Sequence, residues 1–108
     1  MKKFLSVLAL GLFTASPASA NDLAQAMADG GAWRMQDPSG RSSEITLQPD
    51  GTGRVRAGRI GVRATWVQTD DGFCLTTRPL GTTCLVLSRG ADGFLGISED
   101  GGRFTFVR

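Results

Sequence analysis

The chain has 108 residues, with 15 glycines, two cysteines and neither histidine nor tyrosine. Because histidine is the commonest general base and the usual activator of a nucleophilic side chain, its absence disfavours acid–base and hydrolytic enzymes. Both lysines, Lys2 and Lys3, lie at the amino terminus. Residues 21–108 therefore carry 10 arginines (12 basic residues minus 2) and 10 acidic residues. This balance of charge gives no general reason to expect nucleic acid as a partner.

The first twenty residues have the pattern of a bacterial secretory signal peptide. A basic start, Met1-Lys2-Lys3, precedes a largely apolar run at residues 4–13, and small residues then lead to a signal peptidase site after Ala20. The apolar run is about half as long as the roughly 20 residues that a transmembrane helix needs, so no permanent membrane anchor is predicted after cleavage. The sequence therefore predicts a periplasmic or secreted protein.

Residues 21–31 (NDLAQAMADGG) form a leader for which the sequence leaves two states open. As a short helix, the leader would be capped by Asn21 or Asp22 and ended by Gly30-Gly31. The apolar face of that helix would consist of Leu23, Ala24, Met27 and Ala28. The alternative is a flexible segment, because residues close to a chain terminus are commonly poorly ordered.

Residues 32–108 show short segments of alternating apolar and polar residues, separated by glycine- and aspartate-rich turns about every 8–12 residues. The alternation breaks between Ala57 and Ile60, so we expect a bulge or tight turn at Gly58 that returns Ile60 to the inner face. An open sheet of seven or eight such strands would leave exposed edges. The predicted fold is therefore all-β, a single small antiparallel meander closed into a barrel.

Two of these segments, residues 73–77 and 82–87, flank a turn at Arg78-Pro79-Leu80-Gly81. If the strands pair symmetrically about Pro79, the numbers of paired residues sum to 158, and Cys74 faces Cys84. This register predicts a disulfide within one hairpin, in keeping with export. A redox or metal-binding pair is the alternative, but the spacing is not Cys-x-x-Cys and no histidine could complete a metal site.

The candidate binding residues are four arginines in the middle of the chain: Arg54, Arg56, Arg59 and Arg63. If their apolar neighbours face inward, these arginines point outward along one ribbon. Guanidinium groups bind carboxylate, phosphate or sulfate through paired hydrogen bonds, which suits an acidic partner or anionic lipid headgroups. The alternative is a solvated strand face whose charges discourage aggregation.

Acidic pairs occur at Asp70-Asp71 and Glu99-Asp100, each in an ordinary turn sequence before glycine. The acidic segments Asp50-Gly51-Thr52-Gly53 and Asp70-Asp71-Gly72 do not match the pattern of a calcium-binding loop. The glycine pairs are not followed by a helix, as a phosphate-binding loop requires. We therefore predict no catalytic residue, no metal site and no cofactor, and thus no enzyme.

Trp33 and Trp66 are expected in the core. The segment Gly31-Ala32-Trp33 after a short leader resembles the Gly-x-Trp start of lipocalin-like barrels. It also resembles the start of the bacterial alkaline-protease-inhibitor family, whose members are small exported barrels with one disulfide and an inserting N-terminal leader. The resemblance covers Leu23 to Met35 and the general layout, while the late disulfide within one hairpin departs from the family pattern. It implies a barrel fold and an inhibitor-like role, and no functional residues carry over.

Two functions are compatible with these features. As a protein-binding or inhibitor-like module, the barrel would present residues 21–31 or the arginine ribbon to an unidentified protein partner. As a lipocalin-like carrier, it would hold a small apolar ligand between Trp33, Trp66 and Phe94. A barrel of about eight strands has room for side chains or one small ligand, and 88 residues favour a filled interior.

Overall fold

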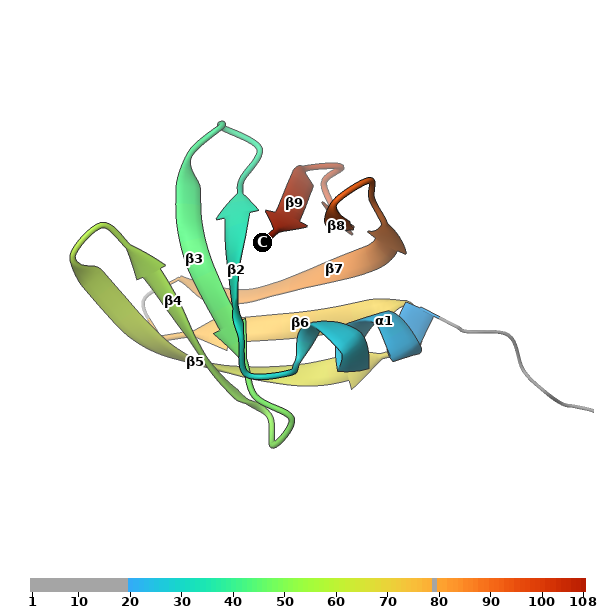
Figure 1. Ribbon diagram of the computed structural model, residues 1–108, viewed down its shortest axis with the longest axis horizontal. Coiled ribbons are helices and arrows are strands. Elements are labelled where there is room, and N and C mark those ends of the chain that lie inside the picture. Colours follow the sequence, from blue (N-terminus) through green and yellow to red (C-terminus); the bar gives the residue numbers. More distant parts are fainter. Residues whose placement is uncertain (1–19, 79) are drawn as a thin grey trace, which may run out of the picture.

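The computed structural model describes residues 20–78 and 80–108, which form one closed antiparallel barrel of eight strands and one short helix (Figure 1). The elements are α1 (Ala20–Met27), β2 (Ala32–Gln36), β3 (Ser42–Leu47), β4 (Thr52–Ala57), β5 (Ile60–Thr69), β6 (Gly72–Thr77), β7 (Gly81–Arg89), β8 (Gly93–Ser98) and β9 (Arg103–Val107). Each strand pairs with the next, and β9 returns to pair with β2. The predicted all-β barrel is confirmed. The signal-peptide prediction for residues 1–20 falls, except for Ala20, outside the described residues.

Alternate residues of each strand fill the barrel interior. Ile45, for example, pairs with Trp33 on one side and with Val55 on the other, and all three face inward. The largest fully buried side chains are Phe73, Phe106, Met27, Ile45 and Leu47. Both tryptophans are buried, as expected, and both satisfy their indole N–H groups: Trp33 donates to the carbonyl of Met27 at 3.0 Å, and Trp66 to that of Gln48 at 2.8 Å.

The leader is part of the core rather than a free segment. Residues 20–27 form α1, which lies against β5, β6 and β7 at one end of the barrel (Figure 1). Its predicted apolar face is confirmed, since Ala24, Met27 and Ala28 are buried and Leu23 packs against them. The chain then turns at Gly30, whose amide donates to the carbonyl of Leu47 at 3.0 Å. The helix therefore closes one end of the barrel.

Arg108 joins the end of this helical segment to the last strand. Its guanidinium makes an ion pair with the carboxylate of Asp29 and lies 3.9 Å from the centre of the Trp33 ring. The same carboxylate accepts a hydrogen bond from the amide of Gly31 at 2.9 Å. The hydrogen bond from Arg108, and then that from Gly31, lower the pKa of Asp29 below its ordinary value of 3.8.

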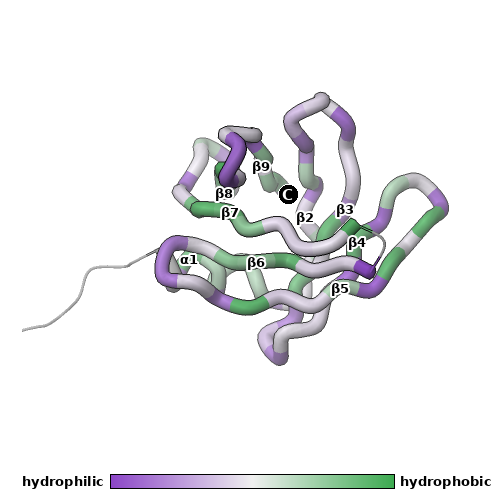
Figure 2. The backbone as a smooth tube through the Cα atoms, turned by 180° about the vertical axis from the view of Figure 1, so that it is seen from behind, coloured by the Kyte–Doolittle hydropathy of each residue, from purple (hydrophilic) through white to green (hydrophobic). Residues whose placement is uncertain are grey.

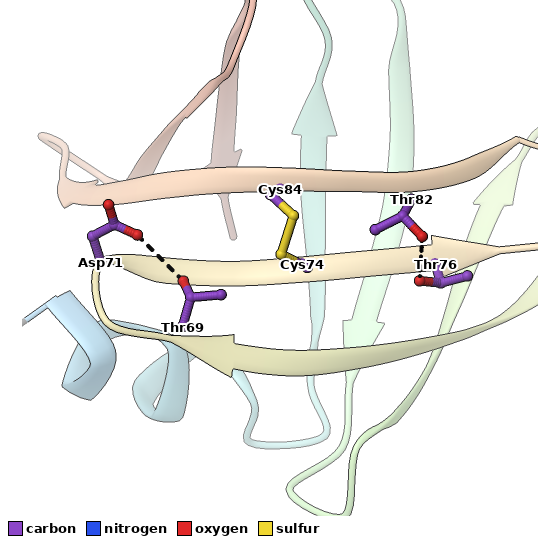
Figure 3. Close-up of a disulfide and its surroundings, with 6 residues drawn as sticks. All are labelled: Thr69, Asp71, Cys74, Thr76, Thr82 and Cys84. Carbon is purple, nitrogen blue, oxygen red and sulfur yellow. Dashed lines mark hydrogen bonds between the residues drawn. A yellow bond between two sulfur atoms is a disulfide. The ribbon is translucent and has the colours of Figure 1, made fainter.

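The cysteine hairpin has the register that the sequence predicts. Phe73 pairs with Leu85 and Cys74 with Cys84, so the pairs sum to 158, and the two cysteines form a disulfide with their Cα atoms 3.9 Å apart. Figure 3 shows the disulfide bridging β6 and β7. Because Phe73 faces the core, the disulfide lies on the outer face. Pro79, about which the pairing is symmetric, lies outside the described residues.

The hairpin of β4 and β5 departs from the prediction at its tip. Gly58, with φ of +62°, and Arg59 form the expected tight turn. Ile60 has the inward phase, yet 70% of its surface is exposed. The reason is that the neighbouring strands stop short: β3 pairs with β4 only as far as Arg56, and β6 pairs with β5 only from Ala64. The hairpin thus projects beyond the core (Figures 1 and 2).

We expect the substitution Asp29→Asn to destabilise the protein at neutral pH, and the deficit to shrink in acid. The pKa of Asp29 is lower in the folded state, so its ion pair contributes stability above the unfolded pKa and loses that contribution as the pH falls through the folded pKa. Thermal unfolding of both proteins at neutral pH and at about pH 2 measures the difference. Asp92→Asn, which removes an exposed turn carboxylate, is the control for charge. A deficit that is equal at both pH values would contradict the expectation.

Candidate anion-binding surface

Arginine side chains form a row across the outer face of β4, β5 and the residue that follows β6. The strand register places Arg54 directly opposite Arg63. Arg78 comes directly after Thr77, whose partner is Ala64, so it extends the same row by one position. On β3, Thr46 pairs with Arg54 and begins the row. We call these four residues, Thr46, Arg54, Arg63 and Arg78, the arginine row.

A second row, made of threonines, lies two residues further along the strands. The register pairs Thr52 with Thr65, Thr65 with Thr76, and Thr76 with Thr82. The hydroxyl groups of Thr76 and Thr82 are 2.8 Å apart and hydrogen-bonded (Figure 3). The threonine row therefore consists of Thr52, Thr65, Thr76 and Thr82, and it runs parallel to the arginine row.

The two rows line one broad depression on the outside of the barrel, with a volume of about 1090 Å³. All three arginines of the row contribute to it, together with Thr46, Thr52, Thr65 and Thr76. The guanidinium of Arg54 extends beside Gly61, where the missing side chain leaves the space open. No carboxylate is among the residues that line this depression. The surface thus offers many hydrogen-bond donors, and none of its lining side chains is negatively charged.

The arginine row is electrostatically unbalanced. Within residues 20–78 and 80–108, the structure contains one salt bridge, Asp29–Arg108, so Arg54, Arg63 and Arg78 have no carboxylate partner there. Like charges directly opposite each other on an antiparallel pair are destabilising. The Arg54–Arg63 pair therefore costs some stability, and an anion bound between the two guanidinium groups would remove that repulsion.

The structure separates the four arginines that the sequence singled out, all of which are exposed. Arg54 and Arg63 lie together in the arginine row. Arg56 lies opposite Glu44 and shares with it a second depression of about 560 Å³, and Arg59 lies in the turn at the hairpin tip. Arg78 is the member that the sequence reasoning missed. The β5–β6 hairpin could have identified Arg78, because the numbers of its paired residues add up to 141, which places residue 63 opposite residue 78.

Aspartates in two of the turns accept hydrogen bonds from groups of the same turn. The Asp50 carboxylate accepts hydrogen bonds from the hydroxyl and then the amide of Thr52, at 2.7 and 3.0 Å, which lower the pKa of Asp50. Asp100 has a lowered pKa for the same kind of reason, through Ser98 first and then the amide of Gly102. Within the described part of the chain, no group of three or more acidic or cysteine side chains suits a metal ion.

No protein-family model matches this chain, and no curated protein or solved structure shows significant similarity to it. In the part of the chain that the structure describes, no helix has the length and apolarity that crossing a membrane requires. The function is therefore inferred from the chemistry of the barrel's own surface.

We expect the same substitution to have opposite effects on stability at two positions of the β4–β5 hairpin. Arg63→Glu replaces the like-charged pair with Arg54 by an opposite-charged one and should raise the free energy of unfolding, by up to about 1 kcal/mol. Because Arg56 pairs with Glu44, Arg56→Glu places two carboxylates opposite each other and should lower the free energy of unfolding. Urea unfolding at low ionic strength measures both. If both substitutions changed the free energy of unfolding by the same amount and in the same direction, the residue opposite each arginine would not determine the effect.

Proposed function

We propose that this protein is an exported, non-enzymatic binding module that holds an anionic partner on the outer face of β3 to β6. The observation that carries the proposal is the arginine row, in which Arg54, Arg63 and Arg78 occupy adjacent positions with no carboxylate partner among the described residues. Export is supported by the signal-like amino terminus and by the disulfide, which oxidising compartments maintain.

The two rows supply complementary donors to an oxyanion. Arginine presents a planar fork of N–H groups to carboxylate, phosphate or sulfate, and threonine adds hydroxyl donors. Neighbouring strands lie about 4.8 Å apart, and side chains on one face of a strand repeat about every 6.7 Å. An extended partner with several negative groups can therefore contact both rows at once.

The packing of the barrel interior favours this module over a carrier of small apolar ligands. Two of the three residues expected to hold such a ligand, Trp33 and Phe94, pack edge-on against each other at 5.2 Å between ring centres. The third, Trp66, packs against Phe73 at 6.4 Å. Met27 of α1 is fully buried in the same cluster. Protein side chains thus occupy the space where the ligand would lie.

The position of the leader favours the arginine face as the contact surface. An inserting leader would have to withdraw Ala24 and Met27 from the core and break the hydrogen bond from Trp33 to the carbonyl of Met27. The arginine row needs no such rearrangement, because its side chains are already exposed. We therefore assign partner binding to the outer face rather than to residues 21–31.

Immobilised heparin, a sulfated polymer, is a suitable probe because the charges of residues 21–108 cancel and retention must come from a local cluster. The double variant Arg54→Ser with Arg63→Ser should elute at lower salt than the wild type, because fewer counterions are released on binding. The control double variant Arg41→Ser with Arg103→Ser removes the same charge from exposed positions outside the row and should elute like the wild type. Equal shifts in both double variants would overturn the proposal.

A further inference from the structure

Two large apolar side chains project from turns close to the arginine row. Ile60, at the tip of the β4–β5 hairpin, is 70% exposed, and Leu80, in the β6–β7 turn, is 82% exposed. Both lie beyond the same end of the β5–β6 ladder, which stops at the pair Ala64–Thr77. Figures 1 and 2 show these turns on the side of the barrel away from α1. We call Ile60 and Leu80 the apolar tips.

The apolar tips are flanked by cations. Arg59 precedes Ile60 directly, and Arg78 lies two residues before Leu80. Arg63 follows Ile60 by three residues on the same strand. In Figure 2, hydrophobic and hydrophilic stretches alternate along the β4–β5 hairpin up to its tip. The surroundings of the apolar tips on β5 and in the two turns therefore combine exposed apolar surface with a local excess of positive charge.

The charges of the turns differ between the two ends of the barrel. The turns at the end of the apolar tips carry three arginines and three carboxylates: Arg41, Arg59, Arg78, Asp37, Glu99 and Asp100. The turns between strands at the α1 end carry only carboxylates: Asp50, Asp70, Asp71 and Asp92. Antiparallel neighbours turn at opposite ends, so these carboxylates lie at the end opposite to the Gly58–Arg59 turn. Near a negatively charged surface, the protein would therefore be oriented with the apolar tips toward that surface.

The order of side chains along β5 matches the layers of a bilayer surface. Gly58 and Arg59 form the turn itself, and the long side chain of Arg59 can extend back toward the headgroups. Behind this turn, β5 carries Ile60 first, then Arg63, and then Thr65 of the threonine row. At about 3.3 Å per residue, Arg63 lies roughly 10 Å behind the apolar tip. The polar headgroup layer of one leaflet is about 5–8 Å thick. Apolar tips at the acyl boundary would thus leave arginine within reach of lipid phosphates.

We infer that the anionic partner is the surface of a phospholipid membrane, which the apolar tips enter while the arginine row binds lipid phosphates. The inference rests on the proposed function, because it uses the same arginines. An acidic protein surface would also bind the arginines, but the two large exposed apolar side chains at the same end of the β5–β6 ladder favour a partner with an apolar layer. A membrane accommodates both, since its apolar layer lies beneath its charged one.

Co-sedimentation with lipid vesicles tests this inference. We expect the protein to bind vesicles of phosphatidylcholine that contain about 30% phosphatidylglycerol and to bind phosphatidylcholine alone much more weakly. The double variant Ile60→Ser with Leu80→Ser should lose at least about tenfold in vesicle affinity while it keeps wild-type retention on heparin. The matched control, Val67→Ser with Val86→Ser, removes two exposed valines near the disulfide and should bind vesicles like the wild type.

The insertion itself is measured with Ile60→Trp, whose fluorescence should shift to the blue on addition of anionic vesicles. Val67→Trp places the probe seven residues away on the same strand and should show no shift. If the wild type is retained on heparin but does not bind vesicles, the membrane inference is wrong and the proposed function stands, with an acidic macromolecule as the partner. If it binds neither, both are wrong. Vesicle binding that is unchanged in the Ile60→Ser, Leu80→Ser variant also overturns the inference.

Discussion

The structure depends on the register of its antiparallel strands. Side chains alternate between the two faces of a strand, so a slip of one residue would move an entire set of side chains from the core to the surface. Closure of the sheet fixes this register on both sides of every strand. The same register that buries Phe73 and Ile45 brings Cys74 to Cys84 and aligns Arg54 with Arg63. Core, disulfide and candidate site are three consequences of one pairing scheme.

Small size makes this barrel dependent on a few additional contacts. A short chain buries a smaller share of its surface than a large one, and its net stability is correspondingly modest. The disulfide offsets part of this deficit, since closure of a short loop contributes roughly 3 kcal/mol. The helix α1 adds buried apolar surface and closes one end of the barrel, where Arg108 holds it through Asp29 and Trp33.

Local alternation was sufficient to predict the elements and the disulfide from the sequence, but not the extent of the core. Ile60 has the same inward phase as Val62, yet it is exposed because the neighbouring strands end before the hairpin does. Strand length relative to its neighbours is a tertiary property that periodicity does not encode. Similarly, Arg78 joins the arginine row only through the register of a second hairpin. The sequence leaves the state of the leader open because eight helical residues gain their stability from packing rather than from propensity.

The arginine row is the feature that stability does not explain. Strand faces in water tolerate many residues, and a like-charged pair in directly opposed positions is an unfavourable choice among them. Its neighbours are threonines, which suit strands and also donate hydrogen bonds. The proposed binding of negative charge on this face would account for the arrangement, at some cost to the stability of the fold.

The most direct test is an NMR titration of the protein with inorganic sulfate, observing the arginine side-chain Nε–H signals. Ten arginines follow residue 20, so the spectrum compares the row with the other arginines in one experiment. We predict saturable shifts at Arg54, Arg63 and Arg78 and only small, non-saturating shifts at Arg41 and Arg103. Shifts of similar size at all arginines, or saturation at arginines outside the row, would contradict this prediction.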